Sequence, residues 1–147
     1  MKTAAYILKS KASAAVHTIG PDDTVFDAVR VMAEKEVGAL VVTEHGRIAG
    51  IVTERDYARK IALLGRASRV TLVREVMSAP VLCVRPEQSA DECMALMTER
   101  RLRHLPVVRN DELLGLISIG DLVKDIISEQ QFIIEQLEHY IAGDRGA

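Results

Sequence analysis

The chain has 147 residues, of which 48% are hydrophobic, and its formal net charge is −2. This length suffices for one domain with a real core, or for two small repeats that share one. The 19 basic and 21 acidic residues give no electrostatic case for nucleic-acid binding. No apolar run approaches the ~20 residues that cross a membrane, and the N-terminus lacks the apolar core of a signal peptide. We therefore expect a cytoplasmic protein without membrane contact.

The first half of the chain predicts a strand, a helix, two strands and a second helix, in that order. Residues 16–19 predict a short strand that ends before a proline. A helix follows the cap residue Thr24, with apolar residues at helical spacing as far as Met32. Residues 39–42 and 48–52 are apolar enough for buried strands, and the turn between them predicts a hairpin.

The second half predicts the same order of elements and then continues further. Residues 81–84, 104–108 and 113–117 predict the strands, and Ser89 caps the helix between the first two. The closing helix extends over residues 121–141, about 31 Å at the standard rise. Its outer half has no counterpart in the first repeat, so its apolar stripe predicts a docking surface for another subunit or a partner. That stripe comprises Ile133, Ile134, Leu137, Tyr140 and Ile141.

The two halves are copies of one unit. A shift of 65 residues aligns positions 7–61 with 72–126 without a gap, and 11 of the 55 aligned positions are identical. Chance would give about three identities at average residue frequencies. We expect an α/β (α+β) fold of two tandem β-α-β-β-α repeats in one pseudo-twofold module, followed by an extended C-terminal helix. The predicted boundaries are 7–64 for repeat 1, 72–127 for repeat 2 and 128–147 for the helical extension and tail.

One motif recurs where a strand passes into a helix in each repeat. Residues 50–56 and 115–121 each contain a glycine, two aliphatic residues, a hydroxyl, two variable positions and an aspartate. Free N–H groups and the helix dipole favour an anion at such a position. A hydroxyl can donate to a phosphate oxygen, and a carboxylate can accept from both hydroxyls of a ribose. These residues predict a pair of nucleotide sites. The hydroxyl–carboxylate pairs are Thr53 with Asp56 and Ser118 with Asp121.

A structural role explains the same pairs without any ligand. A hydroxyl followed three residues later by an acid fits a helix capping box, here with Asp in place of the usual Glu. Two further pairs in the chain have this spacing and lie outside the recurring motif. They are Thr24 with Asp27 and Ser89 with Glu92.

A strand-helix-strand-strand-helix unit that occurs twice and ends in G-h-h-[ST]-x-x-D resembles the CBS domain of cystathionine β-synthase and of many regulatory proteins. The resemblance extends from about residue 7 to residue 127, and Val76-Met77-Ser78 and His104-Leu105-Pro106-Val107 agree with it. The chain is similar to stand-alone bacterial tandem-CBS proteins. In that family two repeats form a compact module with two clefts that can bind adenosine nucleotides, and the modules commonly pair. The resemblance therefore implies a regulatory ligand such as AMP, ADP, ATP or NAD, and a homodimer.

The resemblance also implies roles for individual residues. The motif hydroxyl contacts phosphate and the motif aspartate holds the ribose, so Thr53 and Ser118 are phosphate candidates and Asp56 and Asp121 are ribose candidates. The adenine lies against the first and middle strands of a repeat. The residues implied there are Thr18, Ile19 and Leu40 in one site, and Cys83, Val84, Leu105 and Pro106 in the other.

Basic residues near the middle strand are further phosphate candidates. Family members often carry a cation just before this strand, which implies Arg103 and His104, whereas the first repeat has Gly38 and Ala39 there. Which repeat's cleft the basic pair serves stays open at this stage. Arg55, inside the first motif, is another phosphate candidate. The neighbouring Arg100 and Arg101 suit a solvated helix C-terminus equally well.

Little in the sequence predicts catalysis. The four histidines lack metal-ligand spacing, no nucleophile-elbow motif is present, and the glycines are scattered. Cys83 and Cys93 fit small buried hydrophobic residues better than a redox or metal pair. We thus expect no catalytic residue and no metal site. A nucleotide hydrolase is disfavoured because the chain lacks an evident general base or metal set.

The sequence predicts a regulatory module that binds adenosine nucleotides, senses energy or redox state, and modulates its own assembly or an effector protein. The alternative is a ligand-free CBS scaffold for interaction or dimerisation, in which the motif residues only cap helices.

Overall fold

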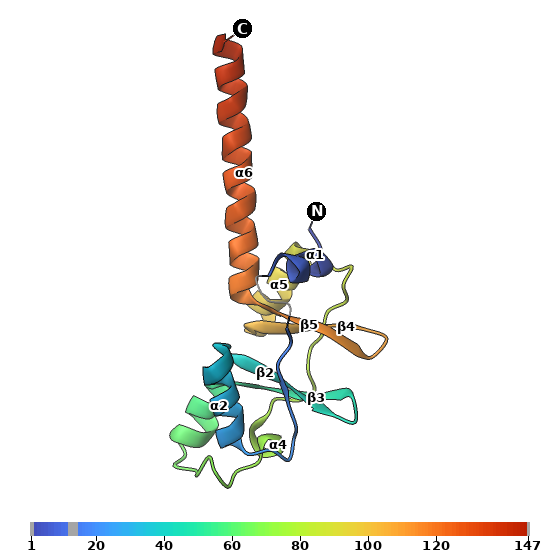
Figure 1. Cartoon of the computed structure of the whole chain (residues 1–147), viewed down its shortest axis with the longest axis vertical. Helices are drawn as coiled ribbons and strands as arrows, with labels where there is room; N and C mark the ends of the chain where they lie inside the picture. The colour runs from blue at the N-terminus through green and yellow to red at the C-terminus, as the bar shows by residue number, and fades with distance from the viewer. Residues whose placement is uncertain (1, 12–14, 147) are drawn as a thin grey trace.

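The computed structural model describes residues 2–11 and 15–146. It shows two stacked α+β halves from which one long helix projects (Figure 1). The first half contains β1 (Thr18–Ile19), α2 (Val25–Lys35), β2 (Ala39–Glu44), β3 (Arg47–Thr53), α3 (Glu54–Asp56) and the π-helix η1 (Tyr57–Ala62). The second contains α5 (Ala90–Arg100), β4 (His104–Arg109), β5 (Glu112–Ser118) and α6 (Ile119–Gly146). The mixed fold of two repeats with an extended C-terminal helix is therefore confirmed.

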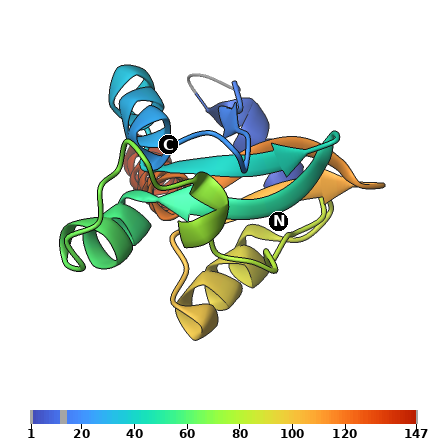
Figure 2. The same cartoon turned by 90° about the horizontal axis from the view of Figure 1, so that it is seen from below.

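The two predicted hairpins are present and closely alike. β2 pairs with β3 and β4 with β5, both antiparallel, and a β-bulge interrupts each pair at equivalent positions, after Val42 and after Val107. Two residues connect the strands of each hairpin, and all four have positive φ angles, as tight hairpin turns require. Viewed from below, one hairpin lies across the other, and β3 contacts β5 (Figure 2).

The strand predicted at residues 81–84 is wrong: only an isolated bridge between Val84 and Val107 remains. In the first repeat, β1 pairs in parallel with β2, and the Val41 N–H donates to the His17 carbonyl. Pro106 occupies the position equivalent to Val41 and has no N–H to donate. The second repeat thus loses the hydrogen bond that would extend its parallel pairing.

The structure contains two short helices that the sequence did not predict. Each belongs to one repeat in sequence but packs on the half formed by the other. α1 (Ala4–Ser10) lies ahead of β1, at the start of the first repeat, but packs on the second half, against β5, α5 and α6. α4 (Val73–Val76) opens the second repeat but packs on the first half, against α2 and β3. Each is held by paired backbone hydrogen bonds: the Ala90 N–H donates to the Lys2 carbonyl at 2.9 Å, and the Val25 N–H to the Thr71 carbonyl at 2.8 Å.

The described apolar side chains form two separate cores rather than one. The first core includes Leu40, Val52 and Ile61 together with Val73 from α4. The second includes Leu105, Ile117 and Leu122 together with Ala4 and Ile7 from α1. The domain boundaries drawn from the sequence stay a prediction, but Ile7 lies in the core of the second half.

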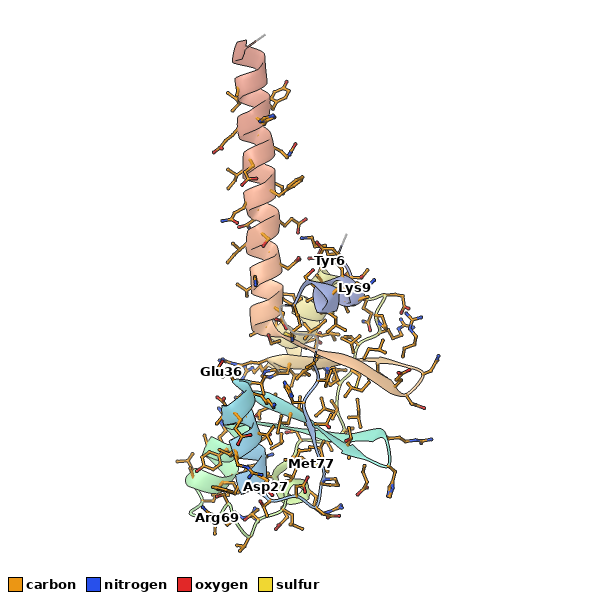
Figure 3. All side chains as sticks on the ribbon, in the orientation of Figure 1. Tyr6, Lys9, Asp27, Glu36, Arg69 and Met77 are labelled. Atoms are coloured by element: carbon orange, nitrogen blue, oxygen red, sulfur yellow. The ribbon has the colours of Figure 1, made fainter. Side chains whose placement is uncertain are left out.

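The glycine that opens each motif makes room for these exchanged segments. A Cβ atom at Gly115 would lie 2.5 Å from Cδ2 of Leu8, and one at Gly50 would lie 2.7 Å from Sδ of Met77. Distances this short are not compatible with normal packing. The motif glycine is therefore required because a side chain from outside the repeat rests on the hairpin at that point; Met77 is labelled in Figure 3.

Candidate functional site

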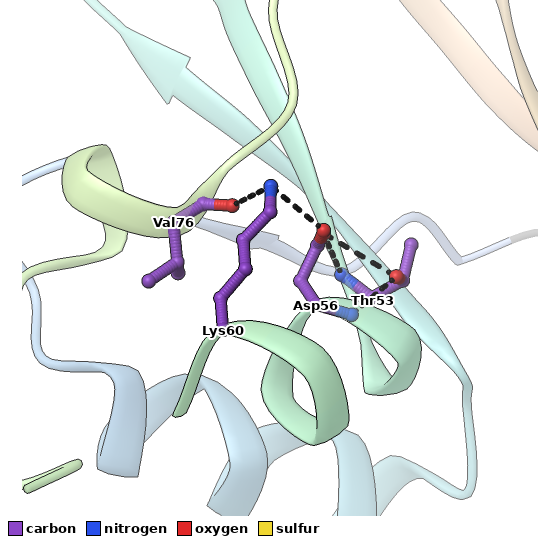
Figure 4. A network of polar contacts seen from close by, with 4 residues as sticks. All are labelled: Thr53, Asp56, Lys60 and Val76. Atoms are coloured by element: carbon purple, nitrogen blue, oxygen red, sulfur yellow. Dashed lines mark hydrogen bonds and ion pairs between the residues drawn. The ribbon is translucent and has the colours of Figure 1, made fainter. Parts of the chain in front are cut away.

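The first motif forms a capping box whose carboxylate also binds a lysine (Figure 4). The Thr53 N–H donates to Oδ2 of Asp56 at 3.0 Å, and the Asp56 N–H donates to Oγ1 of Thr53 at 3.2 Å. Lys60 Nζ lies 3.1 Å from Oδ1 of Asp56 and donates to the Val76 carbonyl at 2.7 Å. Asp56 is buried, and its charge is balanced by a lysine one turn further along the same helical segment.

The second motif forms the same capping box, but its carboxylate pairs with a lysine from another part of the chain. The Ser118 N–H donates to Oδ2 of Asp121 at 2.8 Å, and the Asp121 N–H donates to Oγ of Ser118 at 3.1 Å. Lys11 Nζ lies 2.9 Å from Oδ2 of Asp121 and donates to the Leu116 carbonyl at 2.8 Å. This lysine comes from the N-terminal segment, ahead of β1, so it is far from Asp121 in sequence.

Electrostatics distinguish the groups around the second motif. Burial alone would raise the pKa of Asp121, but the hydrogen bond from the Ser118 backbone and the Lys11 ammonium together hold that pKa below its usual value. Burial lowers the pKa of His104, and the positive charge of Lys11 lowers it further while Asp121 opposes the change. The lowered pKa favours the neutral form of His104, and the charges of Lys11 and Asp121 act on this pKa in opposite directions.

A cavity of about 630 Å³ opens beside Asp121. Its volume lies within the usual range for small-molecule sites. The lining combines three parts of the chain. The N-terminal segment contributes Lys2, Tyr6, Ile7, Ser10, Lys11 and Ala15; the first repeat contributes His17, Lys35, Glu36 and Val37; the base of α6 contributes Asp121, Lys124, Asp125 and Ser128. Four lysines and three carboxylates thus face one space, and a ligand there would contact both halves.

The residues predicted to contact adenine are mostly inside the two cores. Ile19 and Leu40 belong to the first core, and Val84 and Leu105 to the second, so a ligand could reach only their backbone. Pro106 is buried as well. Thr18 is exposed and Cys83 is half-buried. The adenine assignments stay a prediction.

Arg103, just before β4, and His104, the first residue of β4, lie beside the second motif. His104 pairs with Ser118 across the β4–β5 hairpin, and the Ile119 N–H donates to the Arg103 carbonyl at 2.8 Å. The Arg103 side chain is exposed, as is that of Arg55 in the first motif. Gly38, at the position equivalent to Arg103, faces His104: a Cβ there would lie 3.9 Å from its Cε1 atom.

Sequence reasoning missed the lysines that neutralise the two motif carboxylates. Lys60 follows Asp56 at the i,i+4 spacing that favours an ion pair on a helix, so its role was readable from the sequence. No local pattern connects Lys11 or Lys2 with α6, although Lys2 Nζ lies 2.9 Å from Oδ1 of Asp125. Among the described helices, none is long and apolar enough to span a membrane.

The model of the CBS domain family matches the chain twice, at residues 11–63 and 73–128. The CBS domain-containing protein CBSX3, a mitochondrial protein of Arabidopsis thaliana, is 43% identical over an alignment of 127 residues that covers 83% of this chain and 62% of that protein. CBS domain-containing protein YhcV of Bacillus subtilis is 32% identical over 123 residues, 84% of this chain and 87% of YhcV. The chain therefore spans less than two thirds of CBSX3 but most of YhcV.

Solved structures agree with these relatives. A proposed signal-transduction protein with CBS domains from Burkholderia ambifaria has a TM-score of 0.84 and 56% identity, and the match covers 88% of this chain and 96% of that one. A hexameric CBS-CP12 protein from bloom-forming cyanobacteria has a TM-score of 0.75 and 34% identity, with 84% and 70% covered. These proteins are named for CBS domains and signal transduction rather than for an enzymatic activity. The chain belongs to the CBS-domain family and contains two tandem copies of the domain.

Proposed function

We propose that this protein is a regulatory adenosine-nucleotide sensor whose principal site is the cavity beside Asp121. The observation that carries the proposal is the composition of this cavity. It brings the ribose candidate Asp121 together with lysines from the N-terminal segment, from the first repeat and from α6. A carboxylate that accepts from ribose hydroxyls, surrounded by cations that can contact phosphates, matches the two polar parts of a nucleotide.

Nucleotide binding would replace one of the present hydrogen-bond partners of Asp121. The carboxylate now accepts from the Ser118 N–H and from Lys11 through the same oxygen, Oδ2. Ribose hydroxyls would take the place of the Lys11 ammonium, and Lys11 would then be free to contact the phosphates together with Lys35 or Lys124. Ser118 and His104 pair across the β4–β5 hairpin next to Asp121 but are not among the residues that line the cavity, so their phosphate roles stay a prediction.

The first motif supports a weaker site in this proposal. The Asp56 side chain is 10% exposed against 21% for Asp121, so its carboxylate is harder to reach. Displacing the lysine would break the same two contacts at either motif, an ion pair and a hydrogen bond to a carbonyl, so the exposure of the carboxylate makes the difference. The second repeat should therefore dominate nucleotide affinity.

A ligand in the cavity would connect sensing to assembly or to an effector protein. It would touch the first repeat at His17 and Lys35 and the base of α6 at Asp121 and Lys124. A ligand shifts an equilibrium between arrangements when it binds one of them better. Bridging these parts would favour one orientation of α6 relative to the first repeat, and α6 is the element that extends towards other molecules.

Calorimetry and thermal unfolding with AMP, ATP and NAD test the proposal. Asp121→Asn should weaken the tightest ligand by about 1–3 kcal/mol, or about 5- to 150-fold in Kd, because a hydrogen bond to a charged group is lost. Asn keeps an oxygen that can accept the capping N–H of Ser118. Asp56→Asn is the matched control and should change this affinity much less. Saturating ligand at 100 times its Kd should stabilise the wild type by about 2.7 kcal/mol.

Other outcomes identify the alternatives. No stabilisation by any of these nucleotides, together with unchanged mass and fold, would favour the ligand-free scaffold. Equal loss of affinity in both variants would contradict the dominance of the second repeat. Release of product from ATP or NAD would instead indicate a hydrolase.

A further inference from the structure

α6 leaves the body of the protein after its first turns. Leu122 is fully buried in the second core, Asp125 pairs with Lys2, and Ser128 is the last α6 residue that lines the cavity. Every residue from Glu129 to Ala142 is exposed. Figures 1 and 3 show this part of the helix, with its side chains, standing clear of both halves. Most helical stability in proteins comes from tertiary packing of an apolar face, and this part of α6 has none within its own chain.

The exposed apolar residues of α6 follow a heptad repeat. Successive members are separated alternately by four and three residues, from the base of the helix to its tip, over the three heptads that characterise a coiled coil. The positions conventionally called d hold Ile119, Ile126, Ile133 and Tyr140, and the a positions hold Val123, Gln130 and Leu137. The exposed fractions of the apolar members rise from 37% at Ile119 to 69% at Tyr140.

A third apolar row widens this surface. Ile127, Ile134 and Ile141 occupy the e positions, and each is 51–54% exposed. We call the a, d and e residues together the α6 seam. The residues that hold α6 to its own body lie elsewhere: Asp121 and Ser128 at f, Leu122 at g and Asp125 at c. At ~100° per residue the c and f positions lie opposite the seam, whereas Leu122 at g borders its d row. Beyond residue 128 every residue as far as Ala142 is exposed, so the body does not cover the outer part of the seam.

We propose that copies of this chain associate through the α6 seam in a parallel, in-register helical bundle. The seam has one polar position, Gln130. In a parallel bundle each a residue meets its own copy, and Gln amides can donate to and accept from one another. An antiparallel pair sets a against d and would place Gln130 against a d residue, three of which are isoleucines that offer its amide no hydrogen bond.

The charges on the helix are compatible with self-association. Three carboxylates lie between residues 129 and 142: Glu129 at g borders the d row of the seam, Glu138 at b borders its e row, and Glu135 at f lies on the opposite side. In a parallel bundle Glu129 faces the e residue of the neighbour, which is Ile134, so it does not meet a like charge there. Isoleucine at the d positions and the additional e row favour three or four helices over two. This inference does not depend on the nucleotide proposal.

Light scattering on the full chain tests the seam with a matched control. The double variant Ile133→Asp, Leu137→Asp should lower the mass relative to the wild type, because it places two charges in the seam. Phe132→Asp is the control: Phe132 is 61% exposed on the same helix but occupies a c position, so this variant should keep the wild-type mass. A monomeric wild type, or the same mass for the seam variant and the wild type, would overturn the proposal.

Cross-linking tests the orientation independently of helix stability. In a Cys83→Ser background, Gln130→Cys should form a disulfide between copies on mild oxidation, whereas Phe132→Cys should form far less. A bundle that cross-links through residue 132 and not through residue 130 would overturn the in-register parallel arrangement.

Discussion

At the scale of single residues, helix capping and ligand binding do not exclude each other at the two motifs. A carboxylate has two oxygens and about four acceptor positions. At Asp56 the cap uses Oδ2 and the lysine approaches Oδ1. At Asp121 the cap and the lysine share Oδ2. The Asp121 carboxylate therefore retains acceptor capacity for a ribose hydroxyl while it still caps α6.

The charge of Lys11 should be measurable through its neighbours. Lys11→Met should raise the pKa of His104 towards its usual value, because Lys11 is one of the groups that lower it. The same change should raise the pKa of Asp121, because Lys11 favours its ionised form. Side-chain NMR titration measures both. Lys9→Met, on the exposed side of α1, is the control and should leave both pKa values near those of the wild type; no shift in either group for Lys11→Met would show that the ion pair does not form in solution.

At the scale of elements, the sequence predicted those whose patterns are local. Apolar runs and tight turns located both hairpins, and the cap residues Thr24 and Ser89 located α2 and α5, whose first turns they do cap. The strand at 81–84 failed because its pairing depends on Pro106, which lies more than twenty residues further along. α1 and α4 were missed because each has only one or two turns and gains its stability from packing rather than from propensity.

The close contact between α1 and β5 provides a test of this packing. Gly115→Ala should destabilise the protein by about 1–3 kcal/mol, the usual cost of an extra methyl group in a packed site, because its Cβ would meet Leu8. Combining it with Leu8→Ala should remove most of that additional cost. Urea unfolding of the two single variants and the double variant measures how far their effects on the free energy of unfolding depart from additivity. Strict additivity would mean that Leu8 does not rest on Gly115.

The same set of two single variants and one double variant at Gly50 and Met77 provides a comparison. There a Cβ would also lie 3.0 Å from the Ser78 carbonyl oxygen, which is backbone and cannot be removed. Met77→Ala should therefore rescue Gly50→Ala less completely than Leu8→Ala rescues Gly115→Ala.

At the scale of the whole molecule, the candidate site was only partly predictable. The motif residues and the position of the basic pair followed from the repeat, because each is local to its own unit. The cavity did not, because Lys11, Lys35 and Lys124 come from three separate parts of the chain. Only the path of the N-terminal segment, which passes the first repeat to pack on the second, brings Lys11 to Asp121.

Because α1 packs on the second half and α4 on the first, a substitution in either helix should destabilise the half on which that helix packs. Ile7 is 2% exposed in the second core, so Ile7→Ala should cost about 2–5 kcal/mol, as deletion of buried aliphatic groups does. Native-state hydrogen exchange should then become faster first in α5, β4 and β5, although residue 7 lies ahead of β1, at the first-repeat end of the chain. Val73→Ala should instead speed exchange in α2, β2 and β3, because Val73 lies in the first core. Each variant is the control for the other. If Ile7→Ala loosened the first half, or if both variants gave the same pattern, the two cores would not be the separate cooperative units that the packing indicates.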